Sequence, residues 1–325
     1  MKKRKTASRL ARAIDRFLTH KRTLGHHYRQ EGWLLQRLEY FVTESGRRDL
    51  DEKCFTRWLM SLQDRHPNTR RKWYQIVRNF CCYRRKNEPG CFLPSPDGVS
   101  RPRPYVMPVI VEPWQIARMI GIASKLPNTN ASPLRGPALR LTIGLLYTCG
   151  LRLGELLRLS MGDIEEKGAV LRIRKSKFHK TRLVAMSQST TRELQTYLRK
   201  RRKAFAVDPD MPLLCNRHGG RCHQYSHPGL QHAINQLFDS AGVRGEQGKR
   251  PRVHDLRHSF AVQALIRWYQ DGADVQSLLP KLALYMGHVS IESTAYYLHW
   301  VPTLQSLASD RFEQQFGKLV RGGAR

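Results

Sequence analysis

Apolar side chains recur at three- and four-residue spacing through the first 80 residues, which predicts a bundle of four amphipathic helices. The segment Pro67-Asn68-Thr69 is a typical helix start, so we expect Asn68 or Thr69 to cap the fourth helix. The positions that share this spacing are Leu10, Ile14, Phe17 and Leu18, then Trp33, Leu34, Leu38 and Phe41, then Phe55, Trp58, Leu59 and Leu62, and finally Trp73, Ile76, Val77 and Phe80.

The pattern changes after residue 108, where helical and strand-like segments are mixed. Helical spacing occurs in 139–147, 153–159, 230–241, 254–270 and from 294 onward, with a further candidate at 304–319. We expect Gly272 to end the helix that starts at 254. Residues 170–174 and 182–186 alternate in polarity, which predicts a hairpin whose tip is the basic segment 175–180. The predicted fold class is mainly α with a small β-sheet (α+β).

Residues 89–108 separate these two patterns. This window holds six prolines, and proline removes amide donors and disfavours helix in the preceding residue. We therefore expect an extended linker between a helical N-terminal domain at 1–100 and a larger C-terminal domain at 108–325. No internal repeat is apparent.

Net charge changes the picture of possible partners. The 325-residue chain has 57 basic and 26 acidic residues, a net charge of +31, and such a field attracts polyanions. Nucleic acid is the common intracellular polyanion, although a ribosome-like basic protein would have similar composition. The polar faces of the predicted N-terminal helices are rich in Arg and Lys and suit contact with a phosphate backbone, as at Arg70, Arg71, Lys72, Arg78, Arg84, Arg85 and Lys86.

The N-terminus predicts neither secretion nor membrane insertion. Met1-Lys2-Lys3-Arg4-Lys5 precedes an amphipathic stretch rather than an apolar core, and no segment approaches the length of a membrane span. We expect a cytoplasmic, nucleoid-associated protein whose seven cysteines are reduced thiols. Cys215 and Cys222 lie near several histidines, but the spacing fits no usual zinc motif, so we expect a polar loop there. The sequence predicts no metal and no cofactor.

Two short motifs have the residue types needed to act on a phosphodiester. Breaking that bond without metal requires a nucleophile, cations on the non-bridging oxygens and an acid for the leaving oxygen. His254 and Arg257 lie three apart at a predicted helix start, so both can grip one phosphate. Arg152 precedes Glu155 by three residues, which is consistent with either an oriented phosphate clamp or an ordinary surface ion pair.

Two further choices stay open from the residues alone. The hairpin tip contains Lys175, Lys177 and Lys180, each able to donate a proton or simply to contact DNA. Tyr296 and Tyr297 are adjacent, and either is a candidate nucleophile or a core residue with a satisfied hydroxyl.

Taken in order, five strings of the chain between about 108 and 300 resemble the tyrosine recombinase (phage-type integrase) family. The N-terminal bundle resembles the core-binding domain of that family with lower specificity, and the C-terminal domain resembles its catalytic domain. The strings are Thr148-Cys149-Gly150-Leu151-Arg152-Leu153-Gly154-Glu155-Leu156, Lys177-Phe178-His179-Lys180-Thr181-Arg182-Leu183-Val184, His254-Asp255-Leu256-Arg257-His258-Ser259-Phe260-Ala261, Met286-Gly287-His288 and Thr294-Ala295-Tyr296-Tyr297-Leu298-His299.

The resemblance implies two arginines on the pentavalent phosphorane, Arg152 and Arg257. It implies that His288 donates to the phosphate, that His254 is the acid/base histidine near the nucleophile, and that Glu155 orients the site.

The resemblance also implies a choice at each open position. Lys177 would be the general acid toward the 5′ oxygen, because of its place before the returning strand of the hairpin. Tyr297 would be the nucleophile, because the tyrosine of the family stands nine residues after the Gly-His histidine, and Tyr296 fails that spacing.

The implied function is a site-specific DNA recombinase or integrase, expected to belong to a mobile element, that acts through a 3′-phosphotyrosyl intermediate without metal or cofactor. Two alternatives are a relaxing enzyme similar to type IB topoisomerases and a non-catalytic DNA-binding protein on the same fold. The implied partners are double-stranded DNA, three further copies in a homotetramer on two DNA sites, and accessory DNA-bending proteins or a partner recombinase.

Two further segments lie outside these five strings. Residues 262–284 make a longer connection than family members usually have. In the C-terminal tail, Leu304, Leu307, Phe312 and Phe316 could form an apolar face that docks on a neighbouring copy or on the core of the chain itself.

Overall fold

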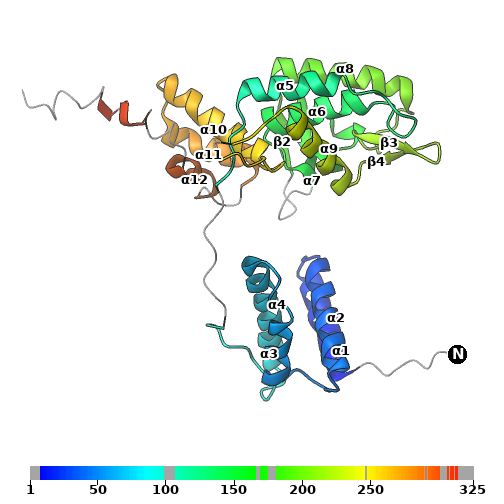
Figure 1. Cartoon of the computed structure of the whole chain (residues 1–325), viewed down its shortest axis with the longest axis vertical. Helices are drawn as coiled ribbons and strands as arrows, with labels where there is room; N and C mark the ends of the chain where they lie inside the picture. Colours follow the sequence, from blue (N-terminus) through cyan, green and yellow to red (C-terminus); the bar gives the residue numbers. More distant parts are fainter. Residues whose placement is uncertain are drawn as a thin grey trace, which may run out of the picture. The chain divides into compact units, whose positions relative to one another are not determined.

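The computed structural model describes residues 8–98, 107–165, 169–174, 181–245, 247–288, 290, 292–300, 306, 308–310 and 312–313. Contacts between residues divide the chain into two compact units, 1–106 and 107–325. Each unit has its own hydrophobic core. Figure 1 shows the helices and strands of both units.

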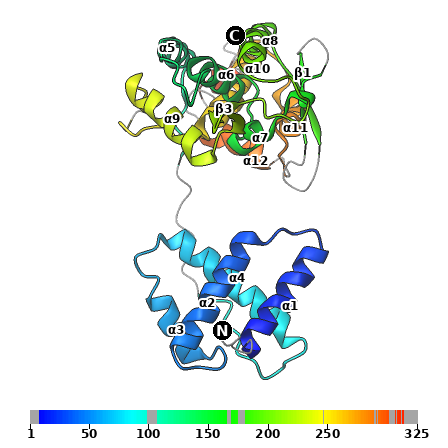
Figure 2. The same ribbon diagram turned by 90° about the vertical axis from the view of Figure 1, so that its right-hand side faces the viewer.

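The N-terminal unit is built from four helices, α1 (Arg9–Thr23), α2 (Arg29–Glu44), α3 (Glu52–Met60) and α4 (Pro67–Arg85). The apolar positions of the four helices meet in one cluster that includes Phe17, Leu35, Trp58 and Phe80. Figure 2 shows the four helices of this unit. The four helices predicted from the apolar spacing are therefore present. This outcome follows from a pattern that is regular enough to define one buried face for each helix.

The start of α4 differs from the prediction. The helix begins at Pro67, one residue after its N-cap His66, whose Nδ1 accepts a hydrogen bond from the amide of Asn68 at 3.2 Å. Proline suits the first helical position, because its missing N–H would have no partner there. The prediction of Asn68 or Thr69 as N-cap was wrong because both are already inside the helix.

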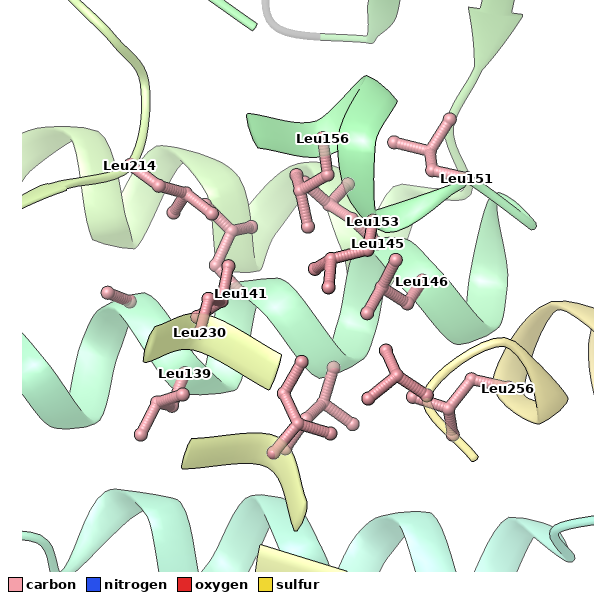
Figure 3. Packing of buried hydrophobic residues seen from close by; sticks show 14 of the residues in the cluster. Leu139, Leu141, Leu145, Leu146, Leu151, Leu153, Leu156, Leu214, Leu230 and Leu256 are labelled. Carbon is pink, nitrogen blue, oxygen red and sulfur yellow. The ribbon is translucent and has the colours of Figure 1, made fainter. Parts of the chain in front are cut away.

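The core of the C-terminal unit surrounds α6 (Arg135–Thr148). Apolar side chains leave this helix on several faces, and Figure 3 shows Leu139, Leu141, Leu145 and Leu146 meeting Leu156, Leu214, Leu230 and Leu256 from other segments. The helices around it are α5 (Pro113–Ser124), α7 (Leu153–Arg158), α8 (Gln188–Ala204) and α9 (His227–Ser240), with a 3-10 turn at Met161–Asp163. A helix that is apolar all round is expected to lie inside a domain.

Two antiparallel hairpins complete the α+β composition. Strands β1 (Val170–Ile173) and β2 (Arg182–Ala185) pair as predicted, with Val170 opposite Ala185. Their tip, residues 175–180 with Lys175, Lys177 and Lys180, lies outside the described residues. The fold class predicted from the sequence is confirmed by this architecture.

The second hairpin replaces the expected polar loop. Strands β3 (Cys215–His218) and β4 (Arg221–Gln224) pair around Gly219 and Gly220, which both have positive φ. The segment forms strands despite its polarity, and its first residue, Cys215, is buried. Within the described part of the chain, no group of three or more His, Cys, Asp or Glu side chains could hold a metal ion.

The last three helices form a separate cluster of the C-terminal unit. These are α10 (Asp255–Gln270), α11 (Val275–Met286) and α12 (Glu292–Trp300). Gly272, at φ +68°, stands just after α10 as expected. The long connection 262–284 forms most of α10 and α11. Its Val262, Leu265 and Leu279 belong to the same apolar cluster as Tyr297 of α12. Most of the predicted helix 304–319, including Leu304, Leu307 and Phe316, lies outside the described residues, and Phe312 is exposed.

One glycine in the turn between α6 and α7 is under a double constraint. Gly150 has φ +59°, and a Cβ built on it would lie 2.5 Å from Cδ1 of Phe260. By contrast, a Cβ on Gly144, inside α6, would meet nothing within 4 Å.

We expect Gly150→Ala to lower the free energy of unfolding by about 1–3 kcal/mol, because alanine disfavours positive φ and its methyl group would displace the Phe260 ring. Gly144→Ala is the matched control and should leave stability unchanged or raise it by up to about 1 kcal/mol. Urea unfolding of the full chain measures both changes. Equal effects of the two substitutions would contradict the constraint at Gly150.

Candidate active site

Arg257 lies at the centre of the candidate site, in the first turn of α10. Its side chain is 1% exposed and its guanidinium donates to two backbone carbonyls, with Nη1 2.5 Å from the oxygen of Gly150 and Nη2 2.7 Å from the oxygen of Met286. The turn itself is fixed by Asp255, which accepts hydrogen bonds from the amide and the guanidinium of Arg252. Arg257 thus joins the α6–α7 turn, the end of α11 and the start of α10.

Arg152 is held beside it by a buried carboxylate. Glu155 accepts from both the backbone amide and Nη1 of Arg152, at 3.0 and 2.7 Å, and Nη2 of Arg152 donates to the oxygen of Gly287 at 3.1 Å. The side chain of Glu155 is 2% exposed and that of Arg152 is 29% exposed. The pair is therefore not an ordinary surface ion pair, since its anion is buried and its cation retains access to solvent.

Arg182 on β2 shares the same carboxylate. Its Nη1 and Nη2 lie 3.1 and 2.9 Å from the two oxygens of Glu155, and its Nε donates to the oxygen of Tyr285 at 2.9 Å. Such a bidentate pair fixes both the distance and the plane of the guanidinium. Arg182 therefore connects the hairpin, the α7 start and the end of α11.

The end of α11 supplies the other side of the site. Gly287 at φ +68° ends the helix and sends the chain toward His288, whose Nδ1 lies 2.7 Å from Oγ1 of the buried Thr294 in α12. A Cβ on Gly287 would lie 2.8 Å from Nη1 of Arg182, so the glycine permits the close approach of that arginine.

Tyr297 reaches the site from α12. It is 2% exposed, its ring packs in the apolar cluster of α10 and α11, and its hydroxyl oxygen lies 2.6 Å from Nδ1 of His258. His258 in turn lies edge to face with His254, with ring centroids 4.7 Å apart. A phenol, two imidazoles and a guanidinium therefore meet within the first turns of α10.

The cations and burial of this cluster keep its histidines neutral. Burial, reinforced by Arg257 and Arg152, lowers the pKa of His254 to about 4 and that of His288 to about 3. Burial and the neighbouring His254 lower the pKa of His258 to about 4. Burial and Arg152 lower the pKa of Arg257 to about 9. Burial opposes ionisation of Glu155, but Arg182 and Arg152 outweigh it and lower its pKa to about 2.

Five of the six residues singled out from the sequence meet here: Arg152, His254, Arg257, His288 and Tyr297. The first four influence one another electrostatically, and Tyr297 acts on Arg257. Lys177, the sixth, lies outside the described residues, as does the side chain of Tyr296.

Sequence reasoning missed two members of the cluster, Arg182 and His258. Both stood inside motifs that had been noted, Lys180-Thr181-Arg182-Leu183-Val184 and Arg257-His258-Ser259. The signal for His258 was its place four residues after His254, which puts both rings on one helix face.

No helix among the described residues is both long and apolar enough to cross a bilayer.

Comparison with known proteins gives one consistent result. The model of the phage integrase family matches residues 112–302. Two proteins of Sinorhizobium fredii named as candidate integrase/recombinases are similar: y4rE is 38% identical over 65% of this chain and 66% of its own length, and y4rB is 30% identical over 95% of this chain and 98% of its own. The tyrosine recombinase XerC of Lactobacillus leichmannii is 30% identical over 54% of each chain.

Solved structures show the same fold. The Tn1549 transposon integrase in complex with a circular intermediate DNA superposes with a TM-score of 0.64 at 15% identity, covering 94% of this chain and 99% of that one. XerH recombinase bound to palindromic difH substrate superposes with a TM-score of 0.62 at 20% identity, covering 86% and 77%.

The neutral, buried histidines of this cluster predict that the folded chain loses stability at low pH. The pKa values of His254, His258 and His288 in the folded chain lie below the ordinary 6.5, so the unfolded chain takes up protons first as pH falls. Their contribution to stability is complete above pH 6.5 and is lost as pH falls toward 4. We expect the thermal midpoint of the C-terminal unit to drop over this window, with a shallower drop for His254→Asn than for the exposed control His232→Asn. A midpoint unchanged between pH 7 and pH 4.5 would contradict neutral burial.

The second prediction separates the buried ion pair from a surface one on the same hairpin. Arg182→Gln leaves Glu155 with one cationic partner and should cost about 2–4 kcal/mol of unfolding free energy. Arg172 on β1 also pairs with a glutamate, Glu165, at 2.7 Å, but its side chain is 45% exposed against 9% for Arg182. Arg172→Gln should therefore cost less than about 1 kcal/mol in the same urea titration. A similar loss for both variants would show that burial of Glu155 does not matter.

Proposed function

Because this chain belongs to the phage integrase family, whose members cleave and rejoin DNA, we propose that it is a site-specific recombinase with Tyr297 as its nucleophile. The observation that carries the assignment is the position of the Tyr297 hydroxyl, which stands beside His258 within the cluster that also holds Arg257. A phenol is a poor nucleophile at neutral pH unless cations and proton acceptors surround it. Tyr297 has such surroundings.

The two arginines suit the charge that develops on the phosphate. As Tyr297 attacks, negative charge grows on the non-bridging oxygens, and fixed donors stabilise it without reorganising. Arg152 is held by Glu155 yet keeps part of its surface open, so it can donate to one of these oxygens. Arg257 is held in the same cluster by the carbonyls of Gly150 and Met286.

The remaining assignments follow the same chemistry. His288, neutral and oriented by Thr294, would donate to the phosphate, and His254 would act as acid or base beside the nucleophile. Lys177 would protonate the 5′ leaving oxygen from the tip of the β1–β2 hairpin. The product is a 3′-phosphotyrosyl link and a free 5′ hydroxyl, and attack by the 5′ hydroxyl of a partner strand completes the exchange.

Double-stranded DNA is the proposed substrate. The net charge of +31 and the basic faces of the N-terminal helices favour contact with the phosphates of a duplex. Strand exchange between two duplexes requires four active sites, so we propose a homotetramer on two DNA sites, with accessory DNA-bending proteins or a partner recombinase. A mobile element is the proposed context, with the protein on the nucleoid.

A type IB topoisomerase-like relaxing enzyme would use similar residues, and a non-catalytic DNA-binding protein would lack the reaction. Relaxation of a supercoiled plasmid that has no recognition site distinguishes the first alternative from a recombinase. The occupied positions Arg152, His254, Arg257, His288 and Tyr297 speak against the second.

The central test is covalent capture. We expect wild-type protein incubated with a library of nicked duplexes to retain DNA after denaturation, and sequencing of the retained DNA gives the recognition site. Tyr297→Phe should remove this attachment while leaving DNA binding intact, because phenylalanine preserves the ring and removes only the attacking oxygen. Denaturation-resistant DNA on the Tyr297→Phe variant would show that another residue is the nucleophile.

A further inference from the structure

The hydrogen bonds of His258 differ from those of a histidine that is buried for structural reasons. It is 6% exposed, and the hydrogen bond of its Nδ1 to the Tyr297 hydroxyl is 2.6 Å long. Its other nitrogen, Nε2, is buried and has no hydrogen-bond partner among the described residues. Buried histidines normally have both nitrogens satisfied. No network of structural hydrogen bonds therefore explains why this ring is inside the protein.

The contact distinguishes His258 from its neighbour. His254 caps the start of α10 and packs against the His258 ring, whereas the ring that lies against the nucleophile, at a centroid distance of 5.5 Å, is that of His258. The histidine that forms a hydrogen bond with the Tyr297 hydroxyl is thus one turn further along the helix than the histidine of the H-x-x-R motif.

The surroundings of His258 determine its protonation. The charged or titratable groups that act on it are His254, Asp255, Arg252 and Arg257, and Tyr297 faces it from α12. Burial and the cationic neighbours lower its pKa to about 4, so the ring is neutral at neutral pH and carries a free lone pair. Since a phenol always carries a hydrogen that it can donate, the short contact fits an O–H of Tyr297 donated to Nδ1.

We propose that His258, rather than the neighbouring acid/base candidate His254, is the general base that takes the proton of Tyr297 during DNA cleavage. The proposal rests on Tyr297 being the nucleophile. As the Oη–P bond forms and the bond from phosphorus to the 5′ oxygen breaks, the phenolic proton moves to Nδ1 of His258. The electron pair of the broken bond leaves on the 5′ oxygen, which takes a proton from the acid assigned to Lys177. In religation the imidazolium returns its proton to Oη as the phosphotyrosyl bond breaks.

Substrate binding favours this proton transfer. The groups that hold His258 neutral include the cation Arg257, and a DNA phosphate placed against Arg152 and Arg257 offsets their positive field. The base therefore becomes stronger when DNA occupies the site. Without DNA the proton stays on the phenol.

Two substitutions separate a base from a hydrogen-bond anchor. His258→Asn keeps an amide acceptor near the position of Nδ1 but cannot hold a proton, and His258→Ala removes both properties. We expect both to slow formation of the covalent complex by about 100-fold, in line with the usual effect of general acid–base catalysis. Replacing Tyr297 by 3,5-difluorotyrosine, whose phenol is more acidic, should recover at least tenfold of this loss in His258→Asn and change the wild-type rate much less.

The controls keep this test separate from the proposed function. The wild-type protein must first form the covalent complex on the captured DNA site, and failure at that step rejects the function rather than the role of His258. His232→Asn, an exposed histidine on α9, should cleave at the wild-type rate. DNA affinity and the thermal midpoint show that each variant is folded, and His258→Gln takes the place of any variant that is not. A wild-type rate for His258→Asn, or a loss that difluorotyrosine leaves unchanged, would overturn the proposal.

Discussion

The bonds of Arg257 to the carbonyls of Gly150 and Met286 hold together the parts from which the site is assembled. These carbonyls belong to segments 107 and 29 residues away from Arg257 in sequence. Gly150 lies in the turn after α6, and Met286 is the last residue of α11. A buried guanidinium that lost either partner would leave donors unsatisfied at high cost. The position of the α6–α7 turn, and with it Arg152, is therefore tied to the position of α10. The same bonds place the end of α11, and with it His288.

Local pattern was enough to predict much of this molecule. Helices with one clear apolar face, such as those with Phe17 and Trp58, were found because their spacing is regular. Three helices, α5, α8 and α11, were missed; α8 is rich in charged residues, and α11 contains Pro280, which ordinarily argues against a helix. The hairpin at β3 and β4 was missed because its strands are short and polar, and only burial of Cys215 marks an inner face.

The candidate site was predicted in composition but not in connectivity. The residues that carry charge could be selected from short motifs and their order. The contact of His258 with Tyr297 spans 39 residues, and the sharing of Glu155 by Arg152 and Arg182 joins segments 27 residues apart. Neither relation follows from spacing, because each depends on how helices and a hairpin pack. The long connection 262–284 is an example. Its extra length had no explanation from the sequence, and in the structure its apolar side chains pack in one cluster with Tyr297.

The groups that hold Arg152 and Arg257 differ in charge. A carboxylate and a carbonyl hold Arg152, whereas two carbonyls hold Arg257. Glu155 is a full counter-ion, but it is shared with Arg182, so the two cations exceed the one anion. The other partners of Arg152 and Arg257 are neutral carbonyls of Gly150, Met286 and Gly287. The positive charge of Arg152, Arg182 and Arg257 therefore exceeds the negative charge of Glu155, and the carbonyls that hold Arg257 carry no net charge that would repel an incoming phosphate. A phosphate diester that enters the site would therefore act as a counter-ion for the part of this positive charge that Glu155 does not balance.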